Sequence, residues 1–142
     1  MKFDQLSQFI QHNIVWVALA LISGTMLLWP MLRRGARSDG LTPGQATMLM
    51  NREEALVVDV RAQAEWDKGH IPNARHLPLD ELDQRMQDLA KFKTRPLIIS
   101  CAGGQRAGSA GARLKKAGFE KVYVLEGGVS AWEQAGLPLA KK

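Results

Sequence analysis

The 142-residue sequence contains very little cysteine and histidine. Its one cysteine, Cys101, excludes an intramolecular disulfide and any Cys-x-x-Cys pair for redox or metal chemistry. Histidine occurs only as His12, His70 and His76, which argues against a His/Cys zinc site. We therefore expect no metal ion and no other cofactor.

Acidic side chains are fewer than basic ones: the sequence has 14 Asp and Glu and 19 Lys and Arg, which gives a formal charge of +5. Most of the excess lies in three arginines within 33–37 and in the final Lys141 and Lys142. Residues 41–140 contain 13 basic and 12 acidic side chains and are nearly neutral. A nucleic-acid-binding domain usually has a basic face of its own, so we expect no nucleic-acid partner.

Asp, Glu, Lys and Arg are absent from Gln5 to Leu32. Within this stretch, 15 of the 19 residues from Ile14 to Leu32 are apolar, and Trp16 and Trp29 lie near the two ends. A helix of this length rises roughly 28 Å, close to the thickness of the hydrocarbon core of a bilayer. The pattern predicts a short N-terminal tail at 1–13 and a transmembrane helix at 14–32.

The arginines that follow this stretch predict its orientation. Basic residues tend to stay on the cytoplasmic side, so we expect a single-pass protein of a bacterial-type inner (plasma) membrane. Its N-terminus would face outward and its C-terminal domain would be cytoplasmic. The bulky residues 28–32 lack the small side chains of a signal-peptidase site, which favours an anchor over a cleaved signal peptide. Residues 33–40 are interpreted as a basic, flexible linker.

Residues 41–140 alternate between buried-strand and helix patterns. Strands are predicted at 55–60, 96–100 and 121–125. Helices are predicted at 43–51, 62–68, 106–117 and 128–135, with a further helix capped by Asp80 that carries Leu82, Met86 and Leu89 on one face. This alternation indicates an α/β domain with a parallel sheet and helices on both faces.

The cysteine directly follows the predicted strand at 96–100, where parallel sheets place their ligands. The residues after it are Ala102, Gly103, Gly104, Gln105 and Arg106. Two glycines allow a tight turn whose N–H groups converge, and the next helix adds a positive N-terminal end. This loop is suited to a thiolate or an anionic substrate. The alternative is a cysteine that serves as a small hydrophobe at a strand end.

Three segments of the sequence resemble the rhodanese domain. They are Val58-Asp59-Val60-Arg61 with Glu65-Trp66 and Gly69-His70-Ile71-Pro72-Asn73-Ala74; Cys101-x₄-Arg106; and Val124-Leu125-Glu126-Gly127-Gly128 with Ala131-Trp132. The resemblance implies a rhodanese-like sulfurtransferase in which Cys101 carries a sulfane sulfur as a persulfide. Related cysteine-dependent phosphatases have arginine six positions after the cysteine, where this chain has Ala107.

The same resemblance suggests roles for the polar residues. It implies substrate binding by the loop 102–106, with Arg106 either screening the persulfide or holding the loop in shape. Asp59, Arg61, Glu65 and His70 are expected to tie loops together. Many catalytic members have a basic or hydroxyl side chain within the loop, which is absent here, so we expect weak thiosulfate activity.

Two functions follow from these patterns. The first is a membrane-tethered sulfurtransferase that takes sulfur from a small donor or a protein persulfide and passes it to a thiophilic acceptor. The second is a non-catalytic rhodanese-fold module that binds a membrane-protein partner.

Overall fold

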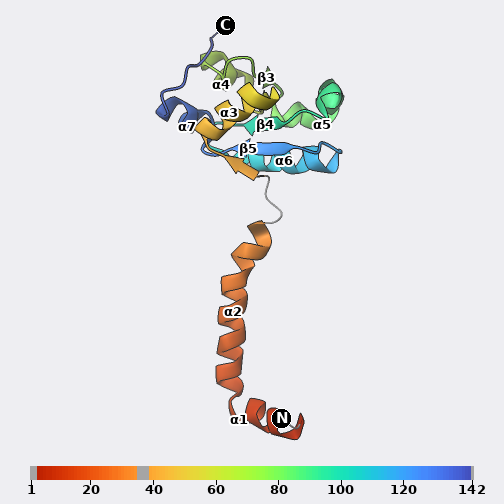
Figure 1. The fold of residues 1–142 in the computed structure, drawn as a ribbon, viewed down its shortest axis with the longest axis vertical. Coiled ribbons are helices and arrows are strands. Elements are labelled where there is room, and N and C mark those ends of the chain that lie inside the picture. Colours follow the sequence, from red (N-terminus) through yellow and green to blue (C-terminus); the bar gives the residue numbers. More distant parts are fainter. Residues whose placement is uncertain (1–2, 35–38, 142) are drawn as a thin grey trace. The chain divides into compact units, whose positions relative to one another are not determined.

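The computed structural model describes the backbone of residues 3–34 and 39–141, and the side chains of residues 3–29 and 40–141. The chain forms two compact units, Met1–Ala36 and Arg37–Lys142 (Figure 1). The predicted linker 33–40 overlaps the last helix of the first unit and the first strand of the second. Its residues 35–38 lie outside the described part of the chain.

The first unit consists of helices α1 (Phe3–His12) and α2 (Ile14–Arg34). Asn13 separates them: its backbone and side-chain amides both donate to the carbonyl oxygen of Phe9, at 3.1 and 3.0 Å. Among the described residues, no single helix is long and apolar enough to cross a membrane. Phe3–His12 and Ile14–Trp29 meet that requirement only as a pair, bent by 89°. The predicted single transmembrane helix at 14–32 is therefore not supported.

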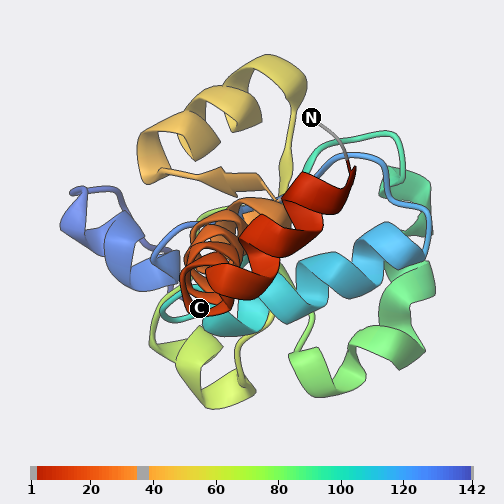
Figure 2. The same ribbon diagram turned by 90° about the horizontal axis from the view of Figure 1, so that it is seen from below.

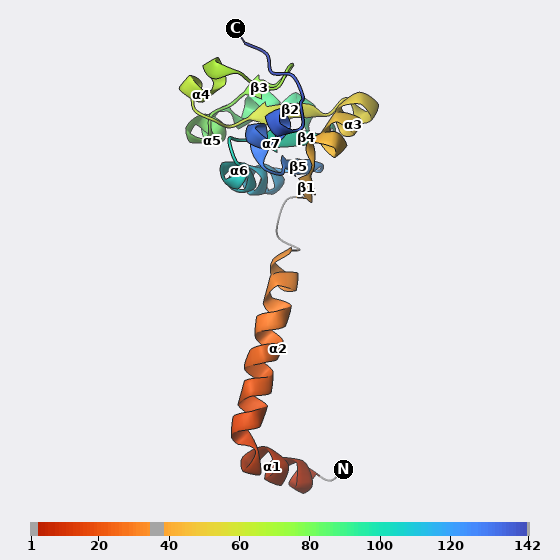
Figure 3. The ribbon, with the colours of Figure 1, turned by 90° about the vertical axis from the view of Figure 1, so that its left-hand side faces the viewer.

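The second unit is built on a five-stranded sheet of the order β1-β5-β4-β2-β3. Its strands are β1 (Asp39–Leu41), β2 (Leu56–Asp59), β3 (Arg75–His76), β4 (Leu97–Ser100) and β5 (Val122–Leu125). Every neighbouring pair is parallel, which confirms the predicted parallel sheet. The three predicted strands are the central β2, β4 and β5, whereas the short β1 and β3 form the two edges (Figure 3).

Among the described residues of this unit, four α-helices lie between strands and a fifth follows β5: α3 (Pro43–Glu53), α4 (Gln63–Lys68), α5 (Leu82–Arg85), α6 (Gln105–Lys116) and, last, α7 (Gly128–Gln134). Two 3₁₀ segments, η1 (Leu79–Glu81) and η2 (Met86–Phe92), flank α5. The prediction of one helix capped by Asp80 is wrong. The first turn forms after Pro78, whose carbonyl oxygen accepts from the N–H of Glu81 at 2.9 Å, so Asp80 lies inside that turn.

The helices cover both faces of the sheet, as predicted (Figure 2). On one face, side chains of the central strands pack with α3 and α7 in a cluster that includes Ile98, Leu125 and Trp132. On the other face, a second cluster joins α5, η2 and α6 to the sheet and includes Ile99, Cys101 and Leu114. Successive strand residues point to opposite faces, which explains why the central strands are mostly apolar, with Asp59 and Ser100 at the ends of β2 and β4.

Candidate active site

Cys101 lies at the carboxyl end of β4, directly before the turn into α6. Its side chain belongs to the α5/α6 core cluster, and the residue is only 1% exposed. The sulfur accepts a hydrogen bond from the backbone N–H of Gly104 at 2.9 Å. Gly104 has φ +96°, a left-handed conformation that favours glycine, and it is the residue from which the loop enters α6.

The remaining backbone amides of the loop have no protein partner. Within residues 40–141, which the structure describes, the N–H groups of Ala102, Gly103, Gln105 and Arg106 donate to no protein acceptor. The last two are the first N–H groups of the twelve-residue helix α6, which is oriented with its partial positive end toward this loop. The predicted binding loop is therefore a set of free N–H donors beside Cys101.

Helix α7 fixes the backbone of this loop from the other side. The N–H groups of Val129 and Ser130 donate to the carbonyl oxygens of Cys101 and Ala102, at 2.8 and 3.2 Å. Gly128 lies directly against the loop backbone, where a Cβ atom would overlap the Cys101 carbonyl. The sequence indicates this proximity, because the paired glycines at 127 and 128 fit a strand-to-helix turn close to the cysteine loop.

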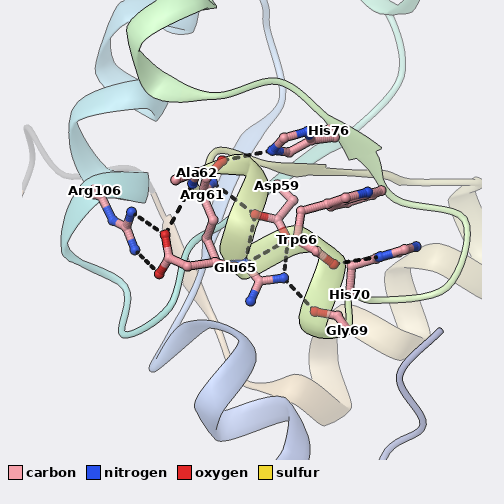
Figure 4. Close-up of polar contacts among 9 residues, drawn as sticks. All are labelled: Asp59, Arg61, Ala62, Glu65, Trp66, Gly69, His70, His76 and Arg106. Carbon is pink, nitrogen blue, oxygen red and sulfur yellow. Dashed lines mark hydrogen bonds and ion pairs between the residues drawn. The ribbon is translucent and has the colours of Figure 1, made fainter. Parts of the chain in front are cut away.

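Arg106 does not extend freely over the loop, because Glu65 of α4 binds its guanidinium with both oxygens (Figure 4). The two hydrogen bonds measure 2.9 and 2.8 Å, and both side chains are about one-third exposed, at 38% and 34%. Hydrogen bonding to Arg106 lowers the pKa of Glu65 from 4.5 to about 2. The same bond raises the pKa of Arg106. Of the two roles considered for Arg106, this pairing favours holding the loop.

Asp59 and Arg61 form a second, buried ion pair beside the first (Figure 4). The guanidinium of Arg61 donates to both carboxylate oxygens of Asp59 at 2.8–3.0 Å and to the carbonyl oxygen of Gly69 at 2.8 Å. The Arg61 N–H also donates to Asp59, at 2.9 Å. These bonds tie the end of β2 to the end of α4, which is a structural role.

His70 contacts a ring stack and not the cysteine loop. Its ring lies 3.6 Å from that of Trp66, with an interplanar angle of 2°, and its Nδ1 lies 3.2 Å from the Trp66 carbonyl oxygen. The opposite face of Trp66 stacks on His76, at 4.7 Å. Nε2 of His76 lies 2.8 Å from the carbonyl oxygen of Arg61. The stack supports the loop that carries the buried ion pair, and sequence reasoning missed it.

Comparisons with known proteins agree with this geometry. Residues 42–135 match the family model of the rhodanese-like domain. The uncharacterized protein YibN of Escherichia coli is 32% identical over 140 residues, which cover 97% of this chain and 98% of that protein. A sulfurtransferase of Allochromatium vinosum is 38% identical over 64% of this chain and 83% of its own. The structure of a thiosulfate sulfurtransferase from Pseudomonas aeruginosa superposes with a TM-score of 0.66 at 28% identity, over 74% of this chain and 20% of that one.

Proposed function

The chain belongs to the rhodanese-like domain family, and from this premise we propose that it is a sulfurtransferase that carries sulfane sulfur as a persulfide on Cys101. One observation carries the proposal: the Cys101 sulfur accepts from the N–H of Gly104, and the other N–H groups of the loop 102–106 have no protein acceptor among the described residues. Such donors stabilise negative charge where they converge. The terminal sulfur of a persulfide on Cys101 would carry its negative charge beside these donors.

The reaction needs two displacements at sulfur. The Cys101 thiolate attacks the sulfane sulfur of the donor, the bond from that sulfur to the rest of the donor breaks, and its electron pair leaves with the donor fragment. An acceptor thiolate then attacks the terminal sulfur of the persulfide, and the electron pair of the breaking S–S bond returns to Cys101. No external oxidant or reductant is required, and no general base is needed once the thiol has ionised.

The protein's own groups assist both displacements. The N–H of Gly104 donates to the Cys101 sulfur and stabilises it as attacking and leaving thiolate. The free amides of the loop receive the terminal sulfur, and α7 prevents the loop from relaxing by holding two of its carbonyl oxygens. Incubation of the full chain with a sulfur donor and cyanide tests this activity. The proposal requires thiocyanate from the wild type and none from Cys101→Ser.

The proposal includes a tether to the inner (plasma) membrane, with the N-terminus outside and the domain in the cytoplasm. The apolar stretch 14–32 and the arginines after it support this arrangement. In α1, Phe3 and Phe9 are exposed, at 91% and 62%, and the helix separates apolar from polar side chains. A helix of this kind favours the interface between lipid headgroups and acyl chains.

A second candidate function is a non-catalytic module that binds a membrane-protein partner. The 1% exposure of Cys101 favours it, because a donor must reach the sulfur through the loop. A strain that carries Cys101→Ser distinguishes the two functions. Loss of the protein's effect in the cell supports catalysis, whereas full retention supports binding.

A further inference from the structure

The residues around Cys101 include two arginines, and each is matched by an acid. Arg61 pairs with Asp59, and Arg106 pairs with Glu65. The pairs also act on each other, because the charge of Arg61 contributes to lowering the pKa of Glu65. Asp59 and Cys101 contribute in turn to raising the pKa of Arg106. The four side chains form one electrostatic unit with no net charge, and Cys101 lies within its field.

Arg106 is the only charged residue between positions 101 and 106. Its guanidinium forms two nearly equal hydrogen bonds to one carboxylate, and this two-pronged geometry fixes its orientation as well as cancelling its charge. An incoming donor therefore meets N–H dipoles but no unpaired cation of the loop. Dipoles suit one negative charge near the sulfur, whereas a dianion approaching a thiolate adds repulsion that grows with each unit of charge.

We propose that Glu65 is a specificity-determining residue that neutralises Arg106 and thereby selects donors with a single negative charge, such as organic persulfides, over dianionic thiosulfate. This inference rests on the proposed function. Glu65 acts through Arg106 and needs no contact with the donor. It gives a structural cause for the weak thiosulfate activity that the loop sequence predicts.

Two donors that differ by one charge make the inference testable. Thiosulfate is a dianion that loses sulfite, and methanethiosulfonate is a monoanion that loses methanesulfinate. In both, the Cys101 thiolate attacks the sulfane sulfur, the S–S bond breaks and its electron pair leaves with the sulfite or sulfinate. Each donor leaves the same persulfide on Cys101, so only the donor changes between the assays.

The decisive variant is Glu65→Gln in the full chain. Glutamine retains an oxygen that can accept from Ala62, as Glu65 does at 3.1 Å, but it removes the negative charge and one of the two oxygens that bind Arg106. We expect kcat/KM to rise roughly tenfold for thiosulfate and roughly threefold for methanethiosulfonate, because the free charge of Arg106 attracts the dianion more strongly. The intrinsic reactivity of the donors cancels when the ratio of the two kcat/KM values is compared between proteins.

Glu81→Gln is the matched control, because Glu81 forms an equally short ion pair with Arg85, at 2.8 Å, on an exposed surface. It should leave the ratio unchanged. If Glu65 had a merely structural role, its loss would change kcat/KM for both donors by the same factor. An unchanged ratio of the two kcat/KM values in Glu65→Gln therefore overturns the inference. If neither donor sulfurates Cys101 in the wild type, the proposed function fails as well.

Salt dependence of the wild type gives a second test that needs no variant. With Arg106 neutralised, kcat/KM for thiosulfate should stay level or rise as salt is added. An unpaired cation would instead attract the dianion, and screening would lower kcat/KM severalfold between about 0.01 and 1 M salt. That decrease would contradict the inference.

Discussion

The carbonyl oxygen of Cys101 accepts a hydrogen bond from the N–H of Val129 at 2.8 Å, so helix α7 holds the residue that is proposed to carry sulfur. The contact is possible because Gly128, with φ +58°, presents no side chain to the loop. The candidate site therefore depends on two helices, α6 behind the loop and α7 beside it.

Gly128→Ala should displace the loop and strongly reduce sulfur transfer. A Cβ atom would overlap the carbonyl groups of Cys101 and Ala102, and the left-handed backbone adds strain. We expect the free energy of unfolding to fall by roughly 2–4 kcal/mol, as measured by urea denaturation. Gly136→Ala is the control, since Gly136 also has positive φ but has no neighbour within 4 Å of a Cβ atom. Gly136→Ala should lower the free energy of unfolding by about 1 kcal/mol and preserve sulfur transfer. Equal losses of stability and activity in both variants would contradict the role of Gly128.

Asp59→Ala should destabilise the domain much more than removal of a surface acid. It leaves the buried guanidinium of Arg61 without its carboxylate, which typically costs about 3–5 kcal/mol. Asp83→Ala breaks the exposed pair with Arg113, at 3.4 Å, and should cost less than about 1 kcal/mol. Urea denaturation of both variants measures the difference, and similar losses would argue against a structural role for the buried pair.

The sequence was most informative where structure depends on neighbouring residues. The start of α3 is one case: Pro43 opens the helix predicted at 43–51, and the hydroxyl of Thr42 before it accepts from the N–H of Gln45. The apolar run before Cys101 likewise located the cysteine at the end of a central strand. By contrast, Glu65 and Arg106 are 41 positions apart, and no local pattern indicates which acid meets which arginine. The broken α5 region was missed because the apolar spacing of Leu82, Met86 and Leu89 does not distinguish one helix from successive short turns.

Glu65 should make stability depend on pH in the acidic range. Its pKa is lowered from 4.5 to about 2 in the fold, so its ion pair contributes fully above about pH 5 and is lost as pH falls toward 2. Because the pair is partly exposed, solvent screening limits the contribution to about 1 kcal/mol. At pH 6, the free energy of unfolding from urea denaturation should be higher for the wild type than for Glu65→Gln by this amount. The difference should shrink as pH falls from 5 to 2, and a constant difference would contradict the assignment.

Leu21→Arg tests the proposed tether. Leu21 lies near the middle of the apolar stretch and is 66% exposed, so an arginine there would place a charge in the hydrocarbon at a cost of about 3 kcal/mol. We expect a smaller fraction of the full chain to remain in membranes after alkaline extraction. Gln8→Arg adds the same charge to exposed α1, outside 14–32, and should have little effect. A wild-type chain that is fully extracted would contradict the tether.

The most direct test of the central claim is the mass of Cys101 after exposure to methanethiosulfonate. The wild-type chain should gain about 32 Da on the peptide that contains Cys101, the mass of one sulfur atom, and lose it when a thiol acceptor is added. Cys101→Ser should gain nothing. An unmodified Cys101, or an adduct that no thiol acceptor removes, would contradict sulfur transfer through this residue.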